Sequence, residues 1–372
     1  MKLTADVVVI GAGVIGCSTA YHLAARGIVD VAVVEMGQVG SGSTSKSAAM
    51  LSLQFCHDEL SARLAQLSYA RYMRFEEEIG VPIDFKPTGW LSVGTASDAV
   101  ELIEGARMLN RLGVATEVLD PAEIKQRYPE IRVDDLVVGT FGPDDGPFDP
   151  HMIVWGYAKR AMALGARVHQ GVRATGVEVT GGHLAGVYTT AGFIAAPIVV
   201  NAAGPWAGEV GRWAGVDVPI LNRSRTILVT GTFPAIPSDR PFVEDVSAGW
   251  YYRPEGDGVL MGMGQEPVED LADPPTSPAI VDAIIDAAVH RVPMLESASI
   301  LTTWTGVRPL TPDGRPILGF VPGVEGLLLN CGWGGVGIIQ APMAGLLAAE
   351  VAANGRVTTM DIEPLSIERF TS

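Results

Sequence analysis

The first part of the chain alternates between short apolar runs and glycine-rich breaks. Residues 5–10 form a β-branched apolar run, which predicts a strand buried on both faces. A glycine-rich turn covers 11–16, and the composition of 17–26 predicts a helix. A second buried strand is predicted over 31–34, directly before Glu35. Together these elements form a βαβ unit of about 30 residues.

The rest of the chain mixes amphipathic helices with strand-like segments. Helices are predicted at 58–79, with Asp58 as N-cap, and at 99–112, 149–164 and 278–289. Strands are predicted near 89–94, in a small meander over 166–192, at 198–204 and in several runs between 220 and 264. The chain closes with a strand at 326–329, a glycine loop at 332–337 and a helix ending near Asn354.

Three glycines between the first strand and the first helix have the spacing G-x-G-x-x-G. Gly11 would form the tight turn, Gly13 would let a pyrophosphate approach the helix N-terminus, and Gly16 would allow close packing of helix on strand. Glu35 ends the second strand, nineteen residues after Gly16, where its carboxylate can accept from ribose hydroxyls. The motif therefore predicts a dinucleotide site, and a glycine turn without a ligand is the alternative.

Signals of this nucleotide-binding type recur near residue 200 and at the end of the chain, with meander-like segments between them. This order predicts an α/β protein in which a discontinuous Rossmann-type domain is interrupted by a second domain on a mainly antiparallel sheet. We expect the cofactor domain to comprise 1–84, 148–216 and 303–372. The inserted substrate domain would comprise 85–147 and 217–302.

Composition and charge exclude several classes of protein. With 48% hydrophobic residues the chain is not disordered, and a net charge of −16 disfavours general nucleic-acid binding. Three separated cysteines predict neither a disulfide framework nor a zinc site and fit a reducing, cytoplasmic location. Stretches 7–25 and 331–349 carry no charge, but their clustered glycines favour buried elements over membrane helices.

A second candidate cofactor segment is the small, hydroxyl-rich loop 40–50. Such a loop can present backbone N–H groups and Ser/Thr hydroxyls to phosphate and ribityl oxygens, and Lys46 could offset phosphate charge. Taken alone, the loop could equally be a flexible linker.

Together with residues 201–206 (NAAGPW), these two motifs resemble the D-amino-acid oxidase superfamily of flavoproteins, which includes glycine oxidase, sarcosine oxidase and D-amino-acid dehydrogenase. Three further segments carry the same resemblance: 141–150 (FGPDDGPFDP), 304–319 (WTGVRPLTPDGRPILG) and 330–342 (NCGWGGVGIIQAP). The resemblance runs through the whole chain in order, and it implies that the discontinuous domain binds FAD.

The resemblance also implies which residues contact FAD, with the last glycine loop placed against the N1–C2=O side of the flavin. The implied contacts are Gly11, Gly13, Val14, Ile15, Gly16, Glu35, Met36, Ser43, Thr44, Lys46, Ser47, Ala48, Ala49, Met50, Val172, Ala202, Ala203, Gly204, Trp206, Arg308, Gly332, Trp333, Gly334, Gly335, Val336, Gly337 and Ile338.

For the substrate, the resemblance implies that Arg308 binds a carboxylate, a task that suits a guanidinium fork. Tyr251 or Tyr252 would assist, with Tyr251 the better match to the family pattern. The alternatives are a structural salt bridge for the arginine and core positions for the tyrosines.

The chain departs from monomeric sarcosine oxidases at three points. Thr303 stands where they attach flavin through a cysteine, so we expect non-covalent FAD. Ile339 replaces their carboxylate-binding lysine, and no lysine follows Lys159 to activate oxygen. Molecular oxygen and another electron acceptor therefore both stay candidates for reoxidation of the flavin.

The resemblance implies FAD-dependent oxidation of an amine α to a carboxylate, such as glycine, sarcosine or a D-amino acid, giving an imine that hydrolyses. The alternatives are the catalytic subunit of a multi-component amino-acid or opine dehydrogenase, a non-catalytic flavin-binding protein, and an NAD-dependent dehydrogenase. Each of the enzyme interpretations is compatible with a homo-oligomer or with a partner subunit. No metal site is expected, because the acidic groups lack a ligand spacing, and we expect His57 to start a helix.

Overall fold

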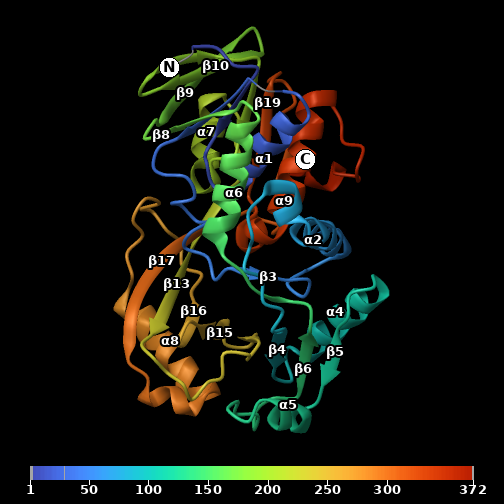
Figure 1. Ribbon diagram of the computed structural model, residues 1–372, viewed down its shortest axis with the longest axis vertical. Helices are drawn as coiled ribbons and strands as arrows, with labels where there is room; N and C mark the ends of the chain where they lie inside the picture. The colour runs from blue at the N-terminus through green and yellow to red at the C-terminus, as the bar shows by residue number, and fades with distance from the viewer. Residues whose placement is uncertain (1–2, 29, 371–372) are drawn as a thin grey trace.

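The computed structural model describes residues 3–28 and 30–370 and has two halves, each built around a large sheet (Figure 1). The upper half contains a six-stranded sheet that is parallel except at β18. Its strands, in spatial order, are β18 (Ile317–Phe320), β19 (Leu327–Cys331), β12 (Ile198–Asn201), β1 (Val7–Ile10), β2 (Val31–Glu35) and β8 (Arg167–Gln170).

Strand β1 shows why both faces of this sheet are covered, because its side chains alternate between two buried clusters. Val7 and Val9 pack with helices on one face, and Val8 and Ile10 pack on the other. The helices of the first face are α1 (Val14–Ala25), α2 (Glu59–Tyr72), α6 (Pro150–Ala163) and α9 (Gly337–Asn354). The other face is covered by α7 (Ala207–Trp213) and by the antiparallel sheet β9 (Ala174–Thr180), β10 (His183–Thr189) and β11 (Gly192–Ala195).

The helix predicted at 58–79 is interrupted, and this part of the prediction was wrong. Asp58 does cap the helix, in a capping box with Ser61, but α2 ends at Tyr72 and α3 (Phe75–Ile79) starts after a break. Arg74 leaves the helical conformation at φ −112° and ψ 12°. The break redirects the chain so that both Phe75 and Ile79 are buried.

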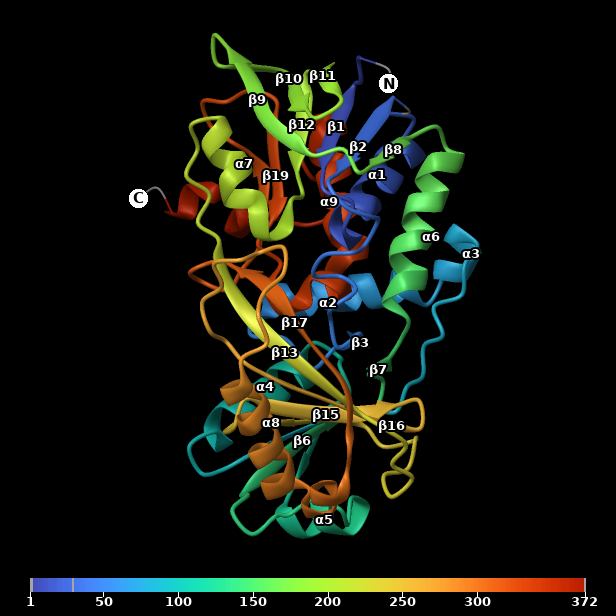
Figure 2. The ribbon, with the colours of Figure 1, turned by 90° about the vertical axis from the view of Figure 1, so that its left-hand side faces the viewer.

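The lower half contains an eight-stranded, mainly antiparallel sheet, as predicted, in which only β14 and β4 are parallel neighbours among the described pairs. Its strands, in spatial order, are β17 (Ile300–Leu310), β13 (Leu221–Thr230), β16 (Gly258–Met263), β15 (Trp250–Glu255), β14 (Phe242–Asp245), β4 (Trp90–Gly94), β6 (Val138–Gly142) and β5 (Glu117–Leu119). The long strands β13 and β17 run from this sheet toward the upper half (Figure 2). The boundary expected at 303 falls inside β17, which pairs with β13 through Leu310.

Helices cover one face of the eight-stranded sheet, and the other face is turned toward the upper half. The covering helices are α5 (Pro121–Arg127) and α8 (Pro278–Arg291). Helix α4 (Ala99–Arg111) lies at the edge of the opposite face, where it contacts α2. The remaining short elements are β3 (Met50–Leu51), β7 (Gly146–Pro147), η1 (Gly204–Trp206), η2 (Pro293–Ser297), η3 (Gly334–Val336), η4 (Glu363–Leu365) and η5 (Ile367–Phe370). The β3–β7 pair lies where the two halves meet (Figure 2).

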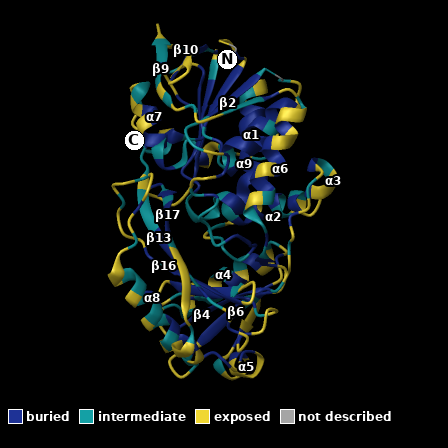
Figure 3. Ribbon diagram, turned by 60° about the vertical axis from the view of Figure 1, so that its left-hand side comes forward, coloured by how far each residue is buried: buried dark blue, intermediate teal, exposed yellow. Residues whose placement is uncertain are grey.

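Helix α9 accounts for the second uncharged stretch of the sequence. One helical segment among the described residues, 334–354, is long and apolar enough to cross a membrane, but 78% of its most apolar window is buried inside the protein. It packs against α1, where the Ser18 hydroxyl donates to the Ala341 carbonyl at 2.7 Å. The dark interior of the upper half in Figure 3 shows this burial. The prediction of a buried helix is confirmed.

Candidate functional site

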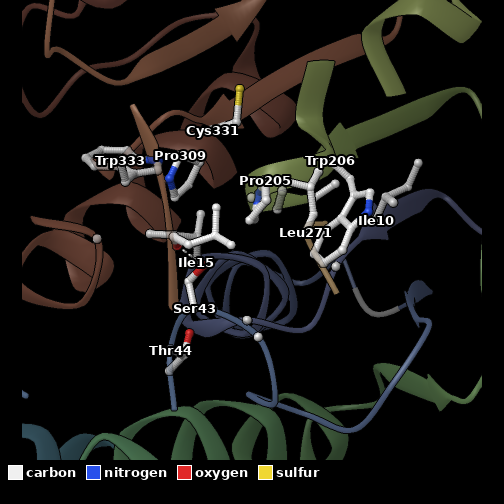
Figure 4. A pocket seen from close by; sticks show the side chains of 18 of the residues that line it. Ile10, Ile15, Ser43, Thr44, Pro205, Trp206, Leu271, Pro309, Cys331 and Trp333 are labelled. Carbon is white, nitrogen blue, oxygen red and sulfur yellow. Dashed lines mark hydrogen bonds between the residues drawn. The ribbon is translucent and has the colours of Figure 1, made fainter. Parts of the chain in front are cut away.

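Two adjoining cavities lie at the meeting of the two halves. The larger, of about 430 Å³, runs along the ends of β1, β2 and β12 and reaches the first turn of α9. Figure 4 shows Ser43 and Thr44 on the hydroxyl-rich loop of this cavity, Trp333 on one side and Trp206 beside Leu271 on the other. The smaller cavity, of about 100 Å³, lies between the same loop and the eight-stranded sheet.

The three motif glycines have the different roles that their spacing predicts. At Gly11, φ is +103°, and a Cβ would lie 2.5 Å from the Ala202 carbonyl oxygen. At Gly16 a Cβ would lie 1.9 Å from the Gly11 carbonyl oxygen, so helix and strand touch there. At Gly13 the nearest atom would be the Thr44 hydroxyl, at 3.5 Å. Only Gly13 therefore leaves space for a ligand.

The N-terminus of α1 at Gly13 is suited to an anion. Its N-cap residue, Gly13, has no side chain to cap it, and its first turn contains no acidic residue. The Val14 N–H donates to the Thr44 hydroxyl at 3.1 Å, which ties the hydroxyl-rich loop to the helix. A helix N-terminus carries a partial positive charge and unpaired N–H groups, so a pyrophosphate fits this end of the cavity.

Glu35 lines the larger cavity in a fixed position at the end of β2. Its Oε2 accepts from the Ala12 N–H at 2.8 Å, and its Oε1 accepts from the Gly37 N–H at 2.7 Å. Each carboxylate oxygen can accept a further hydrogen bond. These free acceptor positions fit the ribose hydroxyls of a dinucleotide, which would donate to them.

The opposite end of the larger cavity is formed by the last glycine loop. Gly332 and Gly334 have φ values of +70° and +50°, which favour glycine, and the Trp333 indole N–H donates to Asn330 Oδ1 at 2.8 Å. The N-terminus of α9 follows without a side-chain cap or an acidic residue in its first turn. Its dipole would stabilise negative charge at this end of the cavity. The two uncapped helix ends and the space between them fit FAD.

The smaller cavity is lined by one face of the eight-stranded sheet and carries charged side chains. Arg225, Glu244 and Arg308 all line it, together with Tyr251. Lys46 lines both cavities. The large apolar side chains of the smaller cavity come from Met50, Phe55, Trp90, Phe242, Ile338 and Ile339.

Arg308 lies at the edge where the cavities meet. Its guanidinium packs against the last glycine loop, where a Cβ at Gly335 would lie 3.1 Å from Arg308 Cζ. Burial and the nearby charge of Arg225 lower the pKa of Arg308 to about 10, while Tyr251 and Glu244 act in the opposite direction. Among the residues that the structure describes, its guanidinium has no hydrogen-bond or ion-pair partner. An unpaired cation facing a cavity is suited to an anionic ligand.

Tyr251 and Tyr252 are neighbours on β15 and therefore point to opposite faces of the sheet. Tyr251 lines the smaller cavity, with the Arg225 guanidinium 4.8 Å from its ring centre. Gly262 makes room for it, since a Cβ there would lie 2.3 Å from the Tyr251 hydroxyl oxygen. Tyr252 is fully buried in the core beneath the sheet and lines neither cavity. The prediction that Tyr252 contacts substrate was wrong.

Most of the other residues expected to contact FAD line one or both cavities. Those lining the larger cavity are Gly11, Gly13, Val14, Ile15, Glu35, Met36, Ser43, Thr44, Lys46, Ser47, Ala202, Ala203, Gly204, Trp206, Gly332, Trp333, Gly334, Gly335, Gly337 and Ile338. Ala48, Ala49, Met50 and Arg308 line only the smaller one. Gly16, Val172 and Val336 line neither. Val172 instead donates its N–H to the Glu35 carbonyl, and its neighbour Arg173 faces the larger cavity.

Ala49 marks a sharp bend between the two cavities. Its φ of +54° lies in the left-handed region, which is unfavourable for any residue with a Cβ. The Ala48 carbonyl accepts from Arg253 Nε at 2.9 Å, and the Ala49 carbonyl accepts from the Phe148 N–H at 3.3 Å. These bonds from both halves of the molecule hold the bend in place.

Sequence reasoning missed Arg225 and Glu244. No motif contains them, although Arg225 stands between two uncharged residues of β13 and Glu244 follows the apolar Phe242 and Val243 of β14. A charged side chain on a buried sheet face needs a polar partner or a polar ligand nearby. The acidic pair at 144–145 has a structural role instead, because Asp145 accepts from the N–H groups of Leu53 and Gln54. His57 is exposed at the start of α2, as expected.

Comparisons with known proteins agree with this geometry. The model of the FAD dependent oxidoreductase family (DAO) matches residues 6–351. Human mitochondrial sarcosine dehydrogenase is 34% identical over 99% of this chain, which spans 41% of that protein. The sarcosine oxidase beta subunit of an Arthrobacter species is 29% identical over 99% of this chain and 92% of that protein. The crystal structure of L-proline dehydrogenase from P. horikoshii superposes with a TM-score of 0.91 at 27% identity, covering 100% of this chain and 99% of that one.

The chain thus spans less than half the length of the sarcosine dehydrogenase it matches. The family match nevertheless covers both halves of the molecule, including each motif on which the resemblance was based. It removes the NAD-dependent alternative. The protein belongs to the DAO family of FAD-dependent oxidoreductases.

Proposed function

We propose that this enzyme oxidises the C–N bond of a small amino acid or N-methyl amino acid. The observation that carries the proposal is Arg308, an unpaired guanidinium at the junction between the FAD-shaped cavity and a second, smaller one. A substrate carboxylate bound there would place its amine in the smaller cavity. Bound FAD would supply the chemistry by accepting a hydride from the substrate carbon, and water would hydrolyse the resulting imine.

The side chains of the smaller cavity would bind and orient the substrate. The Arg308 fork would hold the carboxylate bidentately, and the Tyr251 hydroxyl would add one donor. Phe55, Trp90 and Phe242 would exclude water and bury the substrate's methyl or methylene groups. A cavity of about 100 Å³ favours a substrate of only a few heavy atoms.

Sarcosine is the first substrate to test, because two of the relatives are named for it. We also propose that FAD is bound non-covalently. Thr303, at the position expected for a cysteine link, is exposed and lines neither cavity. Cys331 lines the larger cavity, but burial raises its pKa to about 12, so its thiol is a poor nucleophile.

The test is anaerobic mixing of the purified yellow protein with sarcosine, glycine, L-proline and D-alanine, with flavin absorbance as the readout. We expect at least one of these amines to bleach the flavin, and acetate and propionate not to do so. A flavin that none of the amines reduces would contradict the proposal and favour a non-catalytic flavin-binding protein.

A second candidate is the catalytic subunit of a multi-component dehydrogenase that passes electrons to a partner. The similarity to a sarcosine oxidase beta subunit over 92% of its length supports this candidate. No lysine follows Lys159, so the oxygen-activating lysine of monomeric sarcosine oxidases has no counterpart in that part of the sequence, and the lysine that lines the cavities, Lys46, comes from the hydroxyl-rich loop instead. Substrate-reduced enzyme that reacts slowly with oxygen but rapidly with an artificial dye would favour the dehydrogenase. Rapid peroxide formation would favour the oxidase.

A further inference from the structure

Oxidation of an amino acid requires its nitrogen to be neutral, but a free amino group is mostly protonated at pH 7. The proposed function therefore requires the ammonium group to lose a proton before the oxidation. Glu244 is the one carboxylate among the described residues that line the smaller cavity. We infer that Glu244 accepts the proton of the substrate's ammonium group, so that the cavity binds an amino acid as its zwitterion. This inference rests on the proposed function.

The sheet orients Glu244 toward the substrate. Strand alternation on β14 places Phe242 and Glu244 on the cavity face, while Val243 lies in the core beneath. Tyr251 of β15 and Ser92 of β4 are the cross-strand neighbours of Glu244. These neighbours fix the carboxylate between two strands rather than on a mobile loop.

One oxygen of the Glu244 carboxylate accepts a hydrogen bond from β4, and the remaining acceptor positions of the carboxylate face the cavity. The Ser92 hydroxyl donates to Glu244 Oε2 at 3.5 Å, and the Trp90 indole N–H donates to that hydroxyl at 3.0 Å. Within the described part of the chain, Glu244 makes no ion pair. A partly buried carboxylate with no cation in contact leaves an acceptor for a cationic ligand.

The charged and titratable groups around Glu244 come from several elements. Arg225 of β13 and Arg308 of β17 favour its ionised form, Tyr251 of β15 faces the same cavity, and Lys46 lines it from the loop. Burial is the larger influence and raises the pKa of Glu244. The carboxylate is thereby a stronger base than an exposed glutamate, which brings its proton affinity closer to that of an amine.

The cavity thus carries opposite charges for the two ends of an amino acid. Arg308 would bind the carboxylate, and Glu244 would bind the ammonium group. In the proton transfer an N–H bond breaks and an O–H bond forms on Glu244. The electron pair of the broken bond stays on nitrogen, so the amine is neutral and the carboxylate becomes a carboxylic acid. No oxidant takes part in this step, and the proton leaves to water after the product departs.

The central test compares wild type with Glu244→Gln, which keeps the size and the contact with Ser92 but cannot accept a proton. The rate of anaerobic flavin reduction by sarcosine, or by the best amine of the panel, is measured by stopped flow from pH 6 to 10. We expect a loss of about 100-fold or more at pH 7. The deficit should shrink as pH rises, because more substrate then arrives as the neutral amine. Glu244→Asp should recover part of the rate.

Acetate binding supplies a readout that does not depend on turnover, since acetate has a carboxylate but no amine. Its dissociation constant is obtained at pH 8 from the shift of the flavin spectrum. Glu244→Gln should bind acetate about two- to tenfold more tightly, because a negative charge has left the cavity. A merely structural role would leave acetate binding unchanged or weaken it.

The outcomes separate this inference from the proposed function. A wild-type flavin that no amine reduces contradicts both. A Glu244→Gln protein that binds FAD and is reduced with the wild-type rate and pH profile contradicts only the role of Glu244. A uniform loss at every pH with unchanged acetate binding also contradicts it, since that pattern indicates distorted packing.

Discussion

Replacement of Arg308 by leucine should separate catalysis from stability. The variant removes the charged fork that we propose for the substrate carboxylate. Loss of one partner of a partly buried, hydrogen-bonded charge pair costs about 2–5 kcal/mol. At about 1.36 kcal/mol per tenfold change in rate, kcat/KM should fall by about 30-fold to several thousandfold. The loss should lie toward the upper end, because Arg225 already donates to the Gly264 carbonyl at 3.2 Å and cannot take over.

The same substitution should not destabilise the fold. In the structure the Arg308 guanidinium is unpaired among the described residues and lies near a second cation, Arg225, which together with burial lowers its pKa to about 10. The charged form of Arg308 is therefore less favourable in the folded protein than in the unfolded chain at every pH below about 10. Removal of this charge should therefore raise the free energy of unfolding throughout the neutral range. We expect the Tm of FAD-bound Arg308→Leu to equal or exceed that of wild type.

The assay is anaerobic flavin reduction over a range of sarcosine concentrations, with the Tm read from flavin fluorescence. Arg308→Lys keeps the charge without the fork and should retain an intermediate activity. Arg223→Leu is the matched control, because Arg223 lies opposite Arg308 on β13 but lines neither cavity. Equal losses in Arg308→Leu and Arg223→Leu would show that only a general positive field matters. Unchanged kinetics in Arg308→Leu would remove this residue from the site.

Three further predictions concern the cofactor and the tyrosines. Gly13→Ala should fold but bind FAD weakly, because its Cβ would enter the space for the ligand, whereas Gly16→Ala should misfold, because its Cβ would lie 1.9 Å from a backbone oxygen. Circular dichroism measures folding and flavin content measures FAD binding, and equal behaviour of the two variants would contradict these different roles. Tyr252→Phe should leave activity unchanged and preserve or raise the Tm, since the buried Tyr252 hydroxyl has no partner among the described residues. Tyr251→Phe should raise the KM, because Tyr251 lines the smaller cavity. Acid precipitation should release the flavin into the supernatant, and a yellow pellet would refute non-covalent binding.

The cofactor half was predictable because its signals are local. The apolar runs at β1 and β2, the glycine spacing at 11–16 and Glu35 each specify backbone geometry within a few residues. Packing across the chain interrupted the predicted helix at 58–79, since burial of Phe75 and Ile79 required a change of direction. No local pattern marks that break.

The substrate half was less predictable because its site depends on strand register. Residues 250–252 are all aromatic, so no alternation in the sequence distinguishes Tyr251 from Tyr252, and only the pairing of β15 with its neighbours decides which one faces the cavity. Arg225 and Glu244 are nineteen residues apart in sequence, on strands that are not adjacent in the sheet. A single sequence does not give the sheet order that brings them together.

The most direct test of this account is a crystal structure of the protein with FAD and acetate. The central claim is that the two cavities form one active site, with Arg308 at their junction. We predict the pyrophosphate at the N-terminus of α1, the flavin ring beside the last glycine loop, and acetate on the Arg308 guanidinium in the smaller cavity. A flavin ring outside the junction, or acetate bound away from Arg308, would contradict the claim.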